Sequence, residues 1–166
     1  MKTYLHILVS GAVIAGVAFG LLRIARPEGS AGRDLWSDHF RSAGLDAHLH
    51  SISSEPEKHF LIPELRGRLH FPGFPAVSLR EYVVEDVQIQ IAAFATTAHL
   101  RSILEEAERV ATRKPDRRRF WVRGEGRFLL VIENYRRVGL ERRYGVSSDL
   151  ASRITNAFVQ GACSTE

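Results

Sequence analysis

Leu79 to Phe94 reads LREYVVEDVQIQIAAF, and this segment sets the class of the fold. It holds two runs rich in β-branched and aromatic residues, separated by Glu85-Asp86. In the second run, Val87–Ile91, aliphatic residues alternate with glutamines, which is the period of a strand with one buried face. We therefore predict a β-hairpin here, although Glu-Asp is an unusual pair for a two-residue turn.

A helix and a second hairpin follow. The spacing of apolar residues predicts an amphipathic helix that begins at Thr96 or Thr97 and ends near Thr112. Two further runs, Arg119–Val122 and Arg127–Glu133, flank a turn that contains glycines, and they predict a second pair of strands. The second of these runs has a continuous apolar stretch, which indicates a central strand.

A last helix completes the pattern. It is predicted to begin at Ser147 or Ser148, to present one apolar face, and to end at Gly161, which suits a helix C-cap. The order is strand, strand, helix, then strand, strand, helix. This order predicts an α+β domain in which a four-stranded antiparallel sheet carries both helices on one face.

An uncharged apolar run precedes this domain. Ile7–Leu22 reads ILVSGAVIAGVAFGLL, and with the residues back to Tyr4 it approaches the roughly 20 residues that a membrane-spanning helix needs. We expect a single-pass anchor in the lipid bilayer of the cell membrane, with the C-terminal domain outside the cytoplasm. A cleaved signal peptide and a buried helix of a soluble protein are the alternatives. Ala12, Gly16 and Gly20 lie four residues apart, a spacing that could pair two such helices into a homodimer.

The chain divides into five predicted segments. They are a membrane anchor or signal segment at 1–25, a tether at 26–33, a short helix with a loop-rich lead-in at 34–78, a ββαββα core at 79–161 and a tail at 162–166. The single cysteine, Cys163, excludes an intrachain disulfide and a zinc site made of several thiolates.

The stretch from Leu79 to Gln160 resembles small, uncharacterised exported bacterial domains of the lipoprotein kind. The resemblance depends on Tyr82-Val-Val84 in the first hairpin, and on Trp121 with Gly126-Arg-Phe-Leu-Leu-Val131 in the second. It implies an exported α+β domain. The lipid-attachment cysteine of that kind is missing after the apolar run, and no functional residues carry over.

Positive charge gathers in one region of the second half. Residues 109–143 hold 12 Lys/Arg against 4 Asp/Glu, whereas residues 34–100 hold 5 against 9. One arginine group precedes the strand at 119–122 and the other follows the strand at 127–133, so we expect both at the same end of that hairpin, as one patch. The members of this predicted patch are Arg113, Lys114, Arg117, Arg118, Arg119, Trp121, Arg136, Arg137, Arg142 and Arg143.

Such a patch could dock anionic lipid headgroups, an acidic protein or nucleic acid, or it could be a solvated charged rim. A location outside the cytoplasm argues against nucleic acid. We therefore expect the partner to be another envelope protein or an anionic surface.

Catalytic and cofactor motifs are lacking, and the sequence predicts no cofactor and no metal site. His48 and His50 would share one face of an extended segment, near Ser51 and Ser53, but no nucleophile elbow or zinc-protease helix accompanies them. The sequence thus favours a membrane-anchored, non-catalytic interaction or accessory module of the bacterial cell envelope. An exported hydrolase that uses the His48/His50 region is the alternative.

Overall fold

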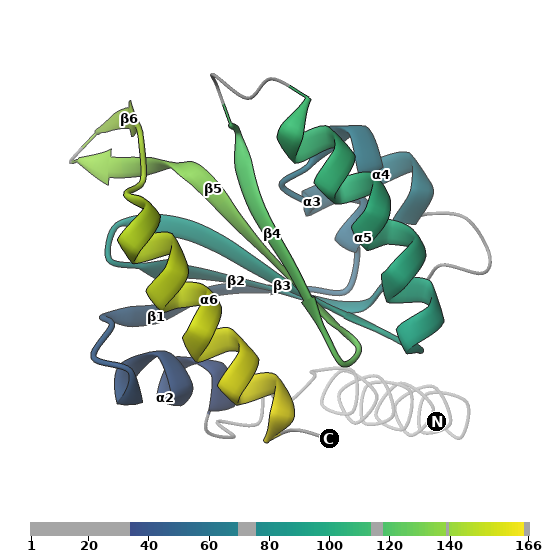
Figure 1. Cartoon of the computed structure of the whole chain (residues 1–166), viewed down its shortest axis with the longest axis horizontal. Helices are drawn as coiled ribbons and strands as arrows, with labels where there is room; N and C mark the ends of the chain where they lie inside the picture. Colours follow the sequence, from purple (N-terminus) through teal and green to yellow (C-terminus); the bar gives the residue numbers. More distant parts are fainter. Residues whose placement is uncertain (1–33, 70–75, 114–117, 139, 165–166) are drawn as a thin grey trace, which may run out of the picture. The chain divides into compact units, whose positions relative to one another are not determined.

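An antiparallel sheet lies at the centre of the part of the chain that the computed structural model describes, residues 34–69, 76–113, 118–138 and 140–164. The strands lie in the order β1-β2-β3-β5-β4, and β6 pairs with β5 (Figure 1). They are β1 (Ala47–Ser53), β2 (Ala76–Val84), β3 (Val87–Phe94), β4 (Phe120–Glu125), β5 (Phe128–Val138) and β6 (Glu141–Tyr144). The helices are α2 (Leu35–Ser42), α3 (Pro56–His59), α4 (Pro63–Leu69), α5 (Thr97–Thr112) and α6 (Ser148–Cys163).

The α+β class is confirmed, but the prediction of four strands is wrong, because the sheet has six. The extra strands are β1 and β6, in which every residue except Ala47 and Ser53 is exposed. Exposed strands lack the alternation of apolar and polar residues on which the prediction depended. The described residues of the segment 34–78, namely 34–69 and 76–78, supply α2, β1, α3, α4 and the start of β2.

The predictions for the N-terminal segment concern residues that the structure does not describe. The expected transmembrane helix, its small residues Ala12, Gly16 and Gly20, and the tether at 26–33 all lie outside the described residues. Among the residues that are described, the structure contains no helix with the length and apolarity needed to cross a bilayer.

The β2–β3 hairpin is confirmed, with Val84 paired to Val87 across a two-residue turn. Glu85 and Asp86 have φ values of 50° and 68°, so both adopt the left-handed conformation that this turn requires and that side chains disfavour. Neighbouring groups hold the turn: the Asp46 amide donates to the Glu85 carboxylate, 3.1 Å, and the Arg137 amide donates to the Asp86 carbonyl, 2.8 Å. These contacts offset the cost of a turn that lacks glycine.

Helices cover both faces of the sheet, so the prediction of both on one face is wrong (Figure 1). In β5, Leu130 and Ile132 face α2 and α6, whereas Leu129 and Val131 face α3, α4 and α5. A strand that is buried on both faces reads as a continuous apolar run rather than an alternating one. The apolar run at 128–132 thus reflects three layers, in which the sheet lies between α2 and α6 on one face and α3, α4 and α5 on the other.

Gln90 shows the same departure from the expected pattern. It lies in the polar row of β3 that was predicted to face water, yet it is 1% exposed because the α3–α4 segment covers it. Its side-chain oxygen accepts from the Leu61 amide, 2.7 Å, and its side-chain nitrogen donates to the His59 carbonyl, 2.8 Å. Both polar groups of the amide are therefore satisfied, as buried polar groups require.

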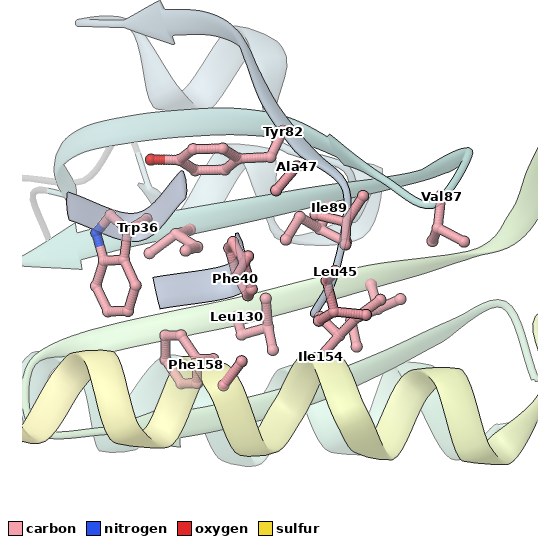
Figure 2. Packing of buried hydrophobic residues seen from close by; sticks show 14 of the residues in the cluster. Trp36, Phe40, Leu45, Ala47, Tyr82, Val87, Ile89, Leu130, Ile154 and Phe158 are labelled. Atoms are coloured by element: carbon pink, nitrogen blue, oxygen red, sulfur yellow. The ribbon is translucent and has the colours of Figure 1, made fainter. Parts of the chain in front are cut away.

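An aromatic stack joins α2 to α6 (Figure 2). Trp36 lies parallel to Phe158 at 5.3 Å between ring centroids and meets Phe128 edge to face at 5.2 Å. A Cβ on Gly161 would approach the Trp36 ring to 2.8 Å. Gly161 is therefore not the C-cap that was predicted; it lies inside α6, which continues to Cys163, and makes room for the tryptophan.

A partly buried carboxylate lies at the beginning of the folded unit. Asp34, which precedes α2, accepts hydrogen bonds from the Tyr82 hydroxyl, 2.9 Å, and from the Arg80 guanidinium, 3.1 Å. Tyr82 is fully buried in β2, and burial raises the pKa of its hydroxyl, as does the negative charge of Asp34. The neutral phenol is thus the form that the fold accommodates.

This environment predicts a loss of stability at alkaline pH. The stability that comes from the raised pKa of Tyr82 is fully present below the ordinary tyrosine pKa of about 10 and is lost as the pH rises toward the folded-state value. Urea unfolding measured between about pH 8 and pH 11 should therefore show a steeper decline for the natural protein than for Tyr82→Phe. Parallel declines in the two proteins would contradict this assignment.

Candidate protein-binding surface

The β5–β6 hairpin divides the predicted arginine patch between two faces. Its register pairs Tyr135 with Tyr144, Arg136 with Arg143 and Arg137 with Arg142. Side chains that are directly opposite share a face, and successive side chains alternate. Arg137 and Arg142 therefore lie on the α5 side of the sheet together with both tyrosines, whereas Arg136 and Arg143 lie on the α6 side.

The α5 side of this hairpin combines aromatic and positively charged groups. The rings of Tyr135 and Tyr144 meet edge to face at 5.5 Å, and the Arg142 guanidinium lies over the Tyr135 ring at 5.3 Å. Arg142 also contacts both carboxylate oxygens of Glu133, which is largely buried. This ion pair offsets the repulsion between Arg142 and Arg137, which face each other across the strands.

Asn134 joins the hairpin to the beginning of β4. It is 5% exposed; its side-chain oxygen accepts from the Val146 amide at 2.7 Å, and its side-chain nitrogen donates to the Arg118 carbonyl at 2.6 Å. The Tyr144 hydroxyl donates to the same carbonyl at 3.1 Å. Arg118 is thus held next to the hairpin, although Arg118 and Tyr144 lie far apart in sequence.

Arg119 belongs to the same face. Its guanidinium pairs with Glu64 of α4 at 2.9 Å and lies 5.2 Å from the centre of the Phe120 ring. We name the resulting set the arginine–tyrosine surface. It consists of Arg118, Arg119, Arg137, Arg142, Tyr135 and Tyr144.

Other members of the predicted patch lie elsewhere. Arg136 approaches Asp86 at 3.9 Å and Arg143 approaches Glu141 at 3.3 Å, both on the α6 side. Trp121 is half-buried and packs against the core beneath α2 and α6. Arg113 is exposed at the end of α5, while Lys114 and Arg117 lie outside the described residues. The expected single patch is therefore smaller and divided.

Two cations of the arginine–tyrosine surface are unneutralised. Arg118 and Arg137 are exposed, and neither forms an ion pair with any residue in the described part of the chain. At the tip of the hairpin, Leu140 is fully exposed and Val138 is 46% exposed. Free cations beside tyrosines and exposed aliphatic groups are a composition typical of protein interfaces. Glu133 and Asn134 could not be recognised as parts of this site from the sequence, because only the fold brings them to their partners Arg142, Arg118 and Val146.

The histidines of β1 form no visible catalytic arrangement. His48 is exposed, and its Nε2 lies 3.0 Å from the Asp46 carboxylate. His50 is the extra residue of a bulge, since Leu49 pairs with Tyr82 and Ser51 with Glu81. Within the ranges that the structure describes, no three or more His, Cys, Asp or Glu side chains gather as metal ligands would.

Comparisons with known proteins add no relative. No protein-family model matches the chain, and searches of curated proteins and of solved structures return no match. The resemblance to exported lipoprotein-like domains therefore stays a prediction, and function must be argued from the surface itself.

Proposed function

We propose that the chain is a membrane-anchored, non-catalytic interaction module of a bacterial cell envelope, and that it docks an acidic protein on the arginine–tyrosine surface. The main support is the pair of guanidinium groups, Arg118 and Arg137, that form no ion pair with described residues, on a face that also carries two tyrosines. Arginine and tyrosine are enriched where proteins bind one another, because both combine apolar area with polar groups.

The arginine–tyrosine surface and the beginning of the folded unit lie at opposite ends of β5. The folded unit begins at Asp34, and the neighbouring Trp36 packs against Phe128 at the first residue of β5. Arg137 lies near the other end of β5, about 30 Å further along an extended strand. Because tyrosines and exposed aliphatic groups lie beside these arginines, the surface suits a protein partner better than lipid headgroups.

Site-specific crosslinking tests the docking. A photo-crosslinking amino acid is placed at Leu140, whose side chain is fully exposed, and membranes are irradiated at low salt. We expect one protein adduct, whose yield falls roughly tenfold or more in Arg118→Glu/Arg137→Glu and also falls as salt is raised.

The matched control is Arg101→Glu/Arg127→Glu, which makes the same change in net charge near the start of α5 and in the β4–β5 turn. This control should keep the adduct. Equal loss in both double variants would contradict docking on the arginine–tyrosine surface, and an adduct with the mass of a phospholipid would contradict the choice of a protein.

The predicted anchor has its own test. Full-length protein should sediment with membranes after alkaline carbonate washing and should keep its complete mass, because an apolar helix of about 20 residues is not extracted by salt or high pH. Recovery of uncut protein in the supernatant would overturn the anchor, and a mass that lacks the first residues would assign the segment to a signal peptide.

A further inference from the structure

A groove of about 500 Å³ runs between α5 and the edge strand β4. Phe120, Trp121 and Val122 line it on the strand side. Only Phe120 and Val122 direct their side chains toward α5, because Trp121 packs on the other face of the sheet. Glu105 and Glu108 line it on the helix side, and Arg118 is the only member of the arginine–tyrosine surface among its lining residues. The groove thus has an apolar floor and charged walls.

The strand beside this groove has an open edge. β4 pairs with β5 on one side, and no other strand in the described part of the chain pairs with its second side. The Asn134 amide donates to the Arg119 carbonyl, so Arg119, and with it every second residue of β4, directs its backbone groups toward β5. By the same alternation, Phe120, Val122 and Gly124 direct their N–H and C=O groups away from β5.

Opposite charges mark the two ends of the groove. Gly124, near the end of β4, lies against Leu100 and Leu104, in the first half of α5. The helix and the strand therefore run in opposite directions, and Glu105 lies beside the later half of the strand. Arg118 precedes the strand at its other end. Glu105, Glu108 and Arg118 form no ion pairs with described residues, whereas Arg109 in the same groove is paired with Glu106.

We propose that this groove binds an extended peptide segment of a partner protein, which adds to β4 as an antiparallel strand. The main-chain groups of Phe120, Val122 and Gly124 would hold the peptide backbone, as in other proteins that bind peptides at a sheet edge. A basic residue in the first half of the peptide faces Glu105 and Glu108, an apolar side chain rests beside Phe120 and Val122, and an acidic residue or the terminal carboxylate faces Arg118. The inference goes beyond the docking function and shares only Arg118 with it.

A peptide library displayed on phage tests this proposal with the full-length chain held in detergent micelles. Enriched peptides should carry a basic, an apolar and an acidic position in that order. Fluorescence anisotropy with a labelled synthetic copy should then show roughly tenfold or greater weakening in Glu105→Lys/Glu108→Lys. Glu55→Lys/Glu57→Lys, a control with the same charge change near α3, should bind as the natural chain does.

Amide hydrogen exchange supplies the second measurement. Bound peptide should slow exchange at Phe120, Val122 and Gly124, whose N–H groups gain acceptors. Lack of enrichment, equal binding by both double variants, or no change at these amides would overturn the groove proposal. If Arg137→Glu/Arg142→Glu abolishes peptide binding while Glu105→Lys/Glu108→Lys does not, the peptide binds the arginine–tyrosine surface and only the groove proposal fails.

Discussion

Replacing Trp36 by alanine is expected to lower the free energy of unfolding by about 3–5 kcal/mol, the usual cost of removing a buried aromatic side chain. Trp36 is 5% exposed and lies between α2 and α6, where it contacts the rings of Phe128 and Phe158. The change deletes both ring contacts and leaves a cavity. At its closest approach to Trp36, α6 carries Gly161, which has no side chain to fill the cavity.

Urea unfolding followed by circular dichroism measures this effect. Leu35→Ala is the control, because Leu35 precedes Trp36 in the same helix but is 51% exposed. Its replacement should change the free energy of unfolding by less than about 0.5 kcal/mol. Similar losses for the two variants would show that α2 contributes through its helix alone and not through the aromatic stack.

Asn134→Ala is expected to cost about 2–3 kcal/mol and to loosen β6. The change removes the acceptor of the Val146 amide, which is buried, and the donor to the Arg118 carbonyl. A buried N–H without a partner carries most of the cost, since the Arg118 carbonyl keeps the Tyr144 hydroxyl as a donor. Because Asn134 holds β4 and β6 together, the variant should also disturb the arginine–tyrosine surface.

Two measurements separate these effects. Urea unfolding gives the cost, and amide hydrogen exchange at Arg142, Arg143 and Tyr144 should become faster in the variant. Asn156→Ala, at an exposed position of α6, changes the same kind of side chain and should leave both measurements unchanged. If the two alanine variants behave alike, Asn134 has no role as a clamp.

Local sequence patterns predicted the local elements well. The alternation in Val87–Ile91 identified the β2–β3 hairpin, and apolar spacing identified α5 close to its observed bounds, Thr97–Thr112. Gly126, with φ of 54°, provides the positive φ expected of the β4–β5 turn, whereas Gly124 lies inside β4 under two leucines of α5. Patterns that involve near neighbours are thus sufficient for hairpins and helices.

Contacts between elements that lie far apart in the sequence could not be predicted in the same way. Which face of the sheet a helix covers depends on distant partners. The apolar run at 128–132 predicted a central strand, and only the structure shows that this strand is buried on both faces. The site was recognised only in outline. The charge excess at 109–143 pointed to Arg118, Arg119, Arg137 and Arg142, but the separation of Arg136 and Arg143 follows from the register with β6.

The packing of α2 against α6 determines which of the two hydrophobic cores can fold first. The core on the α5 side draws on described residues no later than Val131, so it can assemble while the remainder of the chain is still being synthesised. The opposite core needs Trp36 and Phe40 from the start of the unit together with Ile154 and Phe158 from its end. Until the final helix has been synthesised, the apolar residues of that core stay exposed to water. A nonsense mutation before α6 would therefore leave an incompletely folded product that chaperones and proteases bind.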